Sequence, residues 1–157
     1  MLTPEQLMRR AIALSAEKMR AGLGGPFGAI IARAGAVIAE GHNQVTSSND
    51  PTAHAEVMAI RAACRQLGSF SLQGCEMYTS CEPCPMCLGA IYWARLDRVY
   101  YANTRADAAT IGFDDDHIYR EFDKPIDGRT VPFIQLGSEE ARRIFREWLE
   151  KPDKIPY

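Results

Sequence analysis

The feature that most constrains this chain is a set of three metal-ligand residue types divided between two places in the sequence. His54 is followed 30 positions later by Cys84, and Cys87 comes three positions after Cys84. Because residues three apart in a first helical turn share a face, both thiols can point at one ligand. A histidine and two cysteines suit tetrahedral zinc. We therefore expect two helix N-termini to converge on a metal, where their free N–H groups favour thiolates.

The number of ligands favours a catalytic site, because three protein ligands leave one position of a tetrahedral zinc open. Zinc lowers the pKa of a bound water to about 7, and Glu56, two residues after His54, is then the candidate proton shuttle. These two residues point about 200° apart on an ideal helix, so we expect the metal to lie beyond the helix end. The alternative is a closed structural site with Cys81 as the fourth ligand. Cys64 and Cys75 are predicted to be packing residues.

Length and composition favour one compact domain. The chain has 157 residues, of which 46% are hydrophobic and 24% charged, and a chain of this size buries roughly 70% of its unfolded surface without disulfides. Its net charge is −2, whereas nucleic-acid-binding domains are usually basic. No apolar run approaches the roughly 20 residues of a membrane span, and the N-terminus does not resemble a signal peptide. Five cysteines in such a chain favour metal binding over disulfides, and we expect a cytoplasmic protein.

The order of predicted elements favours an α/β fold. Helices are predicted from Pro4 to a stop at Gly22, from Asp50 towards Leu67, from Pro85 through about Ala94, and from Ser138 onwards. Strands are predicted at residues 29–32, 36–39, 76–80, 98–102 and 131–135, the first two forming a hairpin around Ala34-Gly35. An irregular acidic stretch is expected over residues 107–123. Since strands and helices alternate after the hairpin, we expect one mixed, five-stranded sheet covered by helices on both faces.

Longer stretches of the sequence carry a family resemblance. They are Gly25-Pro26-Phe27-Gly28-Ala29, residues 49–56, residues 80–91, Gly112-Phe113-Asp114-Asp115 and the terminal Tyr157. Together they resemble the bacterial guanine deaminases of the cytidine/deoxycytidylate deaminase family over nearly the whole chain. The pattern H-x-E followed by P-C-x-x-C is the signature of zinc-dependent nucleobase deaminases. The resemblance implies a three-layer α/β/α sandwich, one zinc per subunit, and a homodimer that exchanges a C-terminal segment of about residues 137–157.

The resemblance also implies an activity, the hydrolytic deamination of the purine guanine to xanthine and ammonia. The residues it assigns are Glu56 and Asp115 for catalysis, His54, Cys84 and Cys87 for zinc, and Phe27, Asn43, Ala55, Asp115 and Tyr157 for substrate binding, with Tyr157 reaching the partner's pocket. Residue chemistry independently favours guanine, because its N1–H and 2-amino group are adjacent donors that a carboxylate accepts together. Residues 106–123 hold six acids and one base, which suits such a base better than a phosphate backbone.

Two other interpretations stay open. The zinc motif is shared with enzymes that deaminate other bases, such as cytosine or adenosine in tRNA, and related aminated heterocycles also fit. A zinc-stapled binding module without turnover is the third interpretation, and it predicts that Cys81→Ser releases the metal. The catalytic interpretation predicts that Cys81→Ser keeps it. Neither a nucleic acid nor a membrane is expected as a partner.

Overall fold

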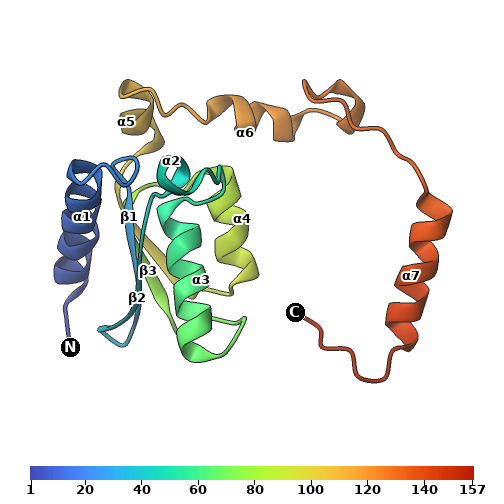
Figure 1. The fold of residues 1–157 in the computed structure, drawn as a ribbon, viewed down its shortest axis with the longest axis horizontal. Helices are drawn as coiled ribbons and strands as arrows, with labels where there is room; N and C mark the ends of the chain where they lie inside the picture. The colour runs from blue at the N-terminus through green and yellow to red at the C-terminus, as the bar shows by residue number, and fades with distance from the viewer. The chain divides into compact units, whose positions relative to one another are not determined.

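In the computed structural model, which describes residues 1–157, the chain separates into two compact units, Met1–Asp115 and Asp116–Tyr157. The first unit consists of α1 (Pro4–Arg20), β1 (Gly28–Arg33), β2 (Ala36–His42), α2 (Val45–Ser48), α3 (Ala55–Leu67), β3 (Glu76–Cys81), α4 (Pro85–Trp93), β4 (Arg98–Asn103) and α5 (Arg105–Thr110) (Figure 1). The second unit consists of α6 (Asp116–Asp123), a 3-10 turn (Ile126–Gly128) and α7 (Ser138–Glu150). No helix in either unit has the length and apolar character needed to cross a membrane.

The first unit is built on a mixed sheet of four strands in the order β2-β1-β3-β4. Strand β1 pairs antiparallel with β2 and β3, and β3 pairs parallel with β4. Side chains of β1 alternate between two cores: Ala29 and Ile31 face one, and Ile30 and Ala32 face the other. Because both faces of the sheet are covered, this strand is apolar along almost its whole length.

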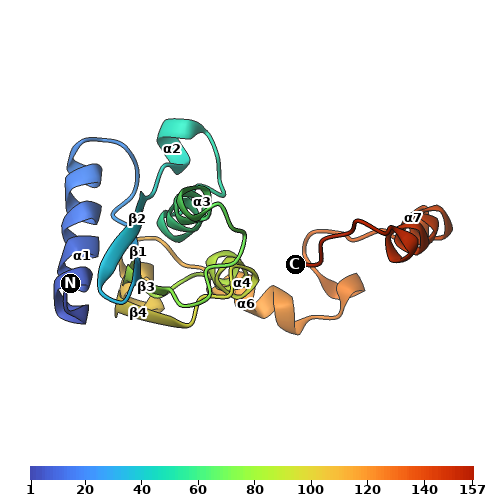
Figure 2. The ribbon, with the colours of Figure 1, turned by 90° about the horizontal axis from the view of Figure 1, so that it is seen from below.

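Helices cover the sheet on both faces, which confirms the predicted three-layer α/β/α sandwich. Helix α1 packs Leu7, Ala11 and Leu14 against one face. Helices α3 and α4 cover the other face, and Figure 2 shows the sheet between the two helical layers. Each core is dry and apolar, so burial of these side chains supplies most of the driving force for the sandwich.

The short-range signals are confirmed. Thr3 caps α1 in a complete capping box with Gln6, and the two partners satisfy N–H groups that a helix start leaves free. The β1–β2 hairpin turns at Ala34 and Gly35, whose φ angles are 48° and 77°. Two successive positive φ angles define the hairpin turn whose twist matches that of the strands.

Two predictions for the second half of the chain are wrong. The sheet has four strands instead of five, because residues 131–135 form no strand. Their own unit contains no strand with which they could exchange backbone hydrogen bonds, and an extended segment without a partner is not a strand. The expected irregular stretch over residues 107–123 contains most of α5 and all of α6.

The start of the second predicted helix is also wrong, because α3 begins at Ala55 and not at Asp50. The Asp50 carboxylate accepts hydrogen bonds from the backbone N–H and the hydroxyl of Thr52. This local bonding gives the backbone a turn in place of a helix. The displaced start puts His54 before the helix instead of inside its first turn.

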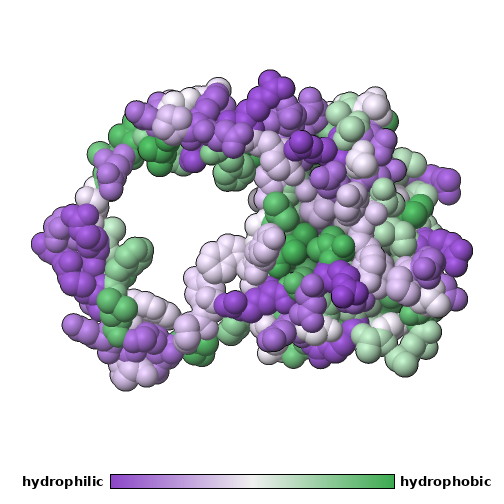
Figure 3. Space-filling model, turned by 180° about the vertical axis from the view of Figure 1, so that it is seen from behind, coloured by the Kyte–Doolittle hydropathy of each residue, from purple (hydrophilic) through white to green (hydrophobic).

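Helix α7 of the second unit has the expected amphipathic pattern and no buried face. The side chains of its apolar stripe, Ile144, Phe145, Trp148 and Leu149, are 42–74% exposed. Figure 3 shows hydrophilic side chains along one side of this helix and hydrophobic ones along the other. An amphipathic helix normally buries such a stripe, so the stripe lacks a partner within its own unit.

Candidate metal centre

The three predicted ligands lie at the N-termini of α3 and α4. His54 is the N-cap of α3 and Cys84 is the N-cap of α4, both with extended backbone, and Cys87 lies in the first turn of α4. Because His54 lies outside the helix, helical geometry does not set the direction of its side chain. The divergence of about 200° expected for two residues this far apart inside one helix therefore does not apply to His54 and Glu56. Both helix starts present free N–H groups and a partial positive charge to the space between them.

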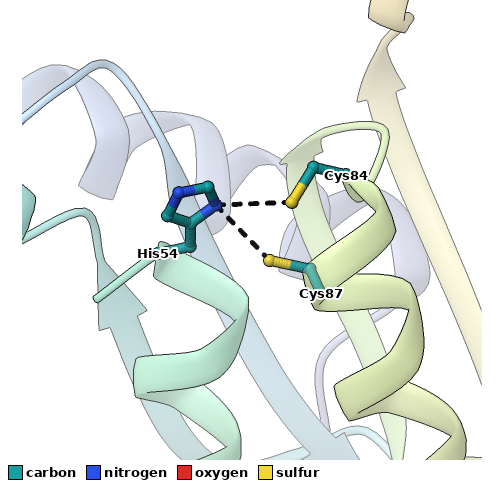
Figure 4. A group of neighbouring side chains, drawn as sticks. All are labelled: His54, Cys84 and Cys87. Carbon is teal, nitrogen blue, oxygen red and sulfur yellow. Dashed lines mark hydrogen bonds between the residues drawn. The ribbon is translucent and has the colours of Figure 1, made fainter. Parts of the chain in front are cut away.

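The ligand atoms are already spaced as a tetrahedral metal requires. Nδ1 of His54 lies 3.5 Å from Sγ of Cys84 and 3.6 Å from Sγ of Cys87 (Figure 4), and the three ligand atoms all lie within 4.8 Å of one another. Zinc bound at its usual distances of about 2.0 Å to nitrogen and 2.3 Å to sulfur holds two such ligands about 3.6 Å apart. The donor set and its spacing thus fit zinc, with Nδ1 as the histidine ligand.

The cluster is electrostatically prepared for a thiolate. The pKa of Cys84 is lowered to about 4, chiefly because the Cys87 thiol donates a hydrogen bond to it and also because His54 lies beside it. The same hydrogen bond raises the pKa of Cys87, which keeps its proton. The hydrogen bond with Cys84 also raises the pKa of His54. A divalent cation would replace these shared protons, since only deprotonated sulfur and nitrogen bind metal.

Glu56 is buried beside the cluster. Oε2 of its carboxyl group lies 3.5 Å from Sγ of Cys87. Burial raises the pKa of the Glu56 carboxyl. A carboxyl group whose pKa is raised by burial takes up a proton more readily than a solvated one, and this one lies beside the ligand cluster.

The remaining cysteines lie outside the cluster, and the group that could hold a metal consists of His54, Cys84 and Cys87 alone. Cys81 donates a weak hydrogen bond to the carbonyl of Thr104, and burial raises its pKa to about 11. Cys64 and Cys75 pack in the core between the sheet and α3. A closed site with Cys81 as fourth ligand is therefore not what the fold builds.

Asn43 follows β2 and presents a hydrogen-bond donor. Its Oδ1 accepts from the backbone N–H groups of Gly25 and Val45, each at 3.2 Å, and these two bonds identify the oxygen of the amide. The residue is only 7% exposed, and Nδ2 makes no hydrogen bond within the chain. Nδ2 is not among the fully buried atoms that lack a partner, so this NH₂ donor is accessible from solvent.

Phe113, which the sequence placed in a family stretch without giving it a role, contacts the predicted substrate residue Phe27. The ring of Phe113 meets that of Phe27 edge-to-face, with centroids 4.9 Å apart. Asp115 follows two residues later, and its pKa is raised by burial and by the charge of Cys84. The segment that ends at Asp115 thus lies within electrostatic reach of the metal ligands. The signal that pointed to Phe113 was its place in the family stretch Gly112-Phe113-Asp114-Asp115.

The last two predicted substrate contacts have different settings. Ala55, between His54 and Glu56, is fully buried at the start of α3. Its carbonyl lies so close to Gly41 of β2 that a Cβ there would come within 2.2 Å. A glycine inside a strand commonly marks such a close approach. Tyr157 ends the second unit and is 73% exposed.

Comparisons with known proteins agree with this geometry. Residues 1–103 match the family described as the cytidine and deoxycytidylate deaminase zinc-binding region. The chain is 56% identical over 153 residues to guanine deaminase of Bacillus subtilis (strain 168), covering 98% of each chain. It also resembles a solved structure of guanine deaminase from Bacillus subtilis, with a TM-score of 0.97, 55% identity and 99% of each chain covered.

More distant relatives share the fold. A solved structure of guanine deaminase from Nitrosomonas europaea has a TM-score of 0.70 at 34% identity, and the match covers 73% of this chain and 66% of that one. A tRNA-specific adenosine deaminase of Aquifex aeolicus (strain VF5) is 35% identical over 127 residues, covering 80% of this chain and 81% of the relative.

Proposed function

Because this chain belongs to the family of zinc-binding cytidine and deoxycytidylate deaminases, we propose that it catalyses the hydrolytic deamination of guanine to xanthine and ammonia. The observation that carries the proposal is the cluster of His54, Cys84 and Cys87 with the buried Glu56 carboxylate beside it. It occurs in a chain that is 56% identical to a guanine deaminase over 98% of its length. The reaction would be a step of purine breakdown. We also propose a cytoplasmic location, because five free cysteines suit a reducing compartment.

His54, Cys84 and Cys87 would hold one zinc ion per subunit. Zinc in a site with an open position makes a water molecule nucleophilic at neutral pH. The protein prepares for the ion by placing three soft ligands at two helix N-termini, where the helix dipoles stabilise the thiolates. His54 would bind through Nδ1, because that nitrogen faces both sulfurs.

Glu56 would move the protons of the reaction. Its carboxylate takes one proton from the attacking water and delivers it to the ring as the new C2–O bond forms. Glu56 then takes the second proton from the new C2–OH group and gives it to the 2-amino group, which leaves as ammonia as the C2–N bond breaks and the C2=O bond forms. Burial raises the pKa of Glu56, which moves it in the direction that favours both taking and returning a proton.

Asn43 and Asp115 would hold the ring. Oδ1 of Asn43 already accepts from two backbone N–H groups. The amide would therefore bind the base through Nδ2–H, which donates to an acceptor atom of the ring. The Asp115 carboxylate would accept from the adjacent N1–H and 2-amino donors of guanine, a pair that adenine lacks. Phe27 and the buried Ala55 backbone would bound the ring plane. Donor and acceptor chemistry supports the roles proposed for Asn43 and Asp115.

We also propose a homodimer in which residues 137–157 are exchanged and Tyr157 acts in the partner's site. The support is the unpartnered apolar stripe of α7, with the neighbouring exposed residues Phe133, Ile134 and Leu136. Burying that stripe against a second copy would stabilise the dimer, at about 1.5–3 kcal/mol for each large side chain that becomes fully buried. An isolated amphipathic helix of 13 residues is marginal in water, and the exchange removes that problem.

The catalytic proposal is tested with zinc-loaded protein and free guanine, by measuring ammonia release and the ultraviolet spectrum of xanthine. Wild-type protein should turn over guanine. Glu56→Gln keeps the volume of the side chain and should retain zinc but lose turnover by about 10²-fold or more. Retained zinc with wild-type turnover in this variant would overturn the assigned mechanism, and no turnover by folded, zinc-loaded wild-type protein would overturn the substrate.

The exchange is tested by mixing two defective subunits. A heterodimer of Glu56→Gln and Tyr157→Phe subunits, purified through two different tags, contains one intact site only if Tyr157 acts in the partner's pocket. The expected result is roughly half the wild-type turnover per dimer, because the second site carries both changes. If Tyr157 acts within its own subunit, both sites carry one change and no activity is recovered.

Deamination of adenosine in tRNA is the second candidate, favoured by 35% identity to a tRNA-specific adenosine deaminase. It predicts tRNA binding that weakens steeply as salt rises, because phosphate contacts release counterions. The net charge of −2 and the acidic residues of positions 106–123 favour guanine instead. Salt-sensitive tRNA binding with turnover of adenosine would reverse this order.

A further inference from the structure

The turn that leads into the zinc ligands is joined to a distant part of the chain by one carboxylate. Glu82 lies between the end of β3 and Cys84. Its backbone N–H donates to the carbonyl of Asn103 at 2.8 Å, which extends the parallel pairing of β3 with β4. Its side-chain Oε2 accepts the backbone N–H of Arg105, also at 2.8 Å. Glu82 therefore holds the first residue of α5 against the loop that carries the metal ligands.

Helix α5 is short but closed at both ends, so it can transmit this anchor. Thr104 and Asp107 form a complete capping box at its start. At its end, Gly112 adopts a positive φ of 91°, and the N–H of Phe113 returns to the carbonyl of Ala108 at 3.0 Å. With its terminal N–H and carbonyl groups satisfied, the helix does not need to fray.

The far end of the same segment is anchored by the aromatic contact between Phe113 and Phe27. Such edge-to-face pairs add stability beyond their buried area. Asp115 thus follows a segment that is held at both ends. The Arg105 side chain also acts on Asp115, since its positive charge lowers the pKa of that carboxyl, against the larger effect of burial.

We propose that Glu82 is a positioning residue that couples the zinc-ligand loop to the segment 105–115 and thereby sets the position of Asp115. The inference rests on the proposed function, in which Asp115 binds the base. Glu82 is not a member of the group of possible metal ligands. Its effect passes through the backbone of Arg105, along α5, to Asp115.

The test compares Glu82→Ala and Glu82→Gln with wild-type enzyme, and Asp97→Ala is the matched control. Like Glu82, Asp97 accepts a backbone N–H from a residue 23 positions away in the sequence; the donor is Gly74, at 3.0 Å. It does so in the loops before β3 and β4, at the ends of these strands opposite Cys81 and Asn103. Zinc content, kcat and KM for guanine, and backbone hydrogen exchange of residues 105–115 are measured for each protein.

Loss of a hydrogen bond to a charged acceptor should raise the KM of Glu82→Ala about tenfold, with kcat changed less than about threefold. Zinc content should stay at the wild-type value, and residues 105–115 should exchange faster. Glu82→Gln, which keeps an uncharged acceptor, should lie between wild type and Glu82→Ala in both KM and exchange. If Glu82→Ala does not fold, Glu82→Gln alone tests the proposal: its KM and the exchange of residues 105–115 should both rise above the wild-type values.

The proposal is overturned if neither variant speeds exchange of residues 105–115, or if Asp97→Ala raises KM as much as Glu82→Ala does. Hydrogen exchange also separates this inference from the proposed function. A wild-type protein that does not deaminate guanine would overturn the function, whereas the exchange of residues 105–115 would still decide the role of Glu82.

Discussion

Replacing Gly41 with alanine should displace the start of α3 and disable the site without touching a catalytic group. A Cβ at position 41 would lie 2.2 Å from the carbonyl oxygen of Ala55 and 2.4 Å from the backbone nitrogen of Ala59. Ordinary contacts begin at 3.4 Å, so the helix must retreat from β2 by about 1.2 Å. Both atoms belong to backbone, which cannot rotate away as a flexible side chain would.

The displacement reaches the chemistry because Ala55 lies between His54 and Glu56. A misplacement of about 1 Å at catalytic groups can cost about 10²-fold in rate, and we expect a loss of that size in kcat/KM. Overpacking of this kind costs about 1–3 kcal/mol in stability. For a chain of this length that lowers Tm by about 2–12 °C.

The assay combines guanine deamination, zinc content and thermal unfolding of the zinc-loaded protein. Gly128→Ala is the matched control, because a Cβ there meets only the ring of Pro125, at 3.4 Å. It should change neither rate nor Tm measurably. Wild-type kcat/KM in Gly41→Ala would refute the reasoning, since it would mean that α3 can move without moving His54 and Glu56 from their working positions.

Three further predictions concern the metal, the pH dependence and the core. Cys81→Ser should keep its zinc, whereas Cys84→Ser should lose most of it, because only Cys84 belongs to the ligand group; metal analysis after dialysis checks both. The pKa of Glu121 is lowered to about 2, chiefly by the hydrogen bond from Lys124, and Thr130 also donates to it. A lowered carboxyl pKa contributes stability that is complete above the unfolded value of about 4.3 and is lost as pH falls towards 2. The Thr130 amide should therefore exchange faster, relative to its intrinsic rate, as pH falls through that range, and Glu121→Gln should abolish this dependence. Leu7→Ala should cost about 2–5 kcal/mol in unfolding by denaturant, because Leu7 is buried in the core beneath α1; a cost below 1 kcal/mol would contradict that packing.

Features that depend on neighbouring residues could be predicted from the sequence. The Thr3 capping box and the Ala34-Gly35 turn are confirmed, and His54, Cys84 and Cys87 meet in one group that could hold a metal. In each case the chemistry is complete within a few residues, or the residue types are so specific that their meeting could be expected. The start of α3 could not be predicted in this way, since the Asp50 side chain bonds its own turn and delays the helix.

The sequence by itself determined which atoms can bind the metal and which carboxylate can move a proton, because those properties belong to the residue types. Only the tertiary structure decided how far α3 approaches β2 at Gly41, that Asn43 presents its NH₂ as the free end, and that Glu82 holds the start of α5. It also left residues 131–135 without a strand to pair with. These outcomes depend on backbone groups distant in sequence, and hydrogen bonds or close contacts between them exist only once the layers have packed.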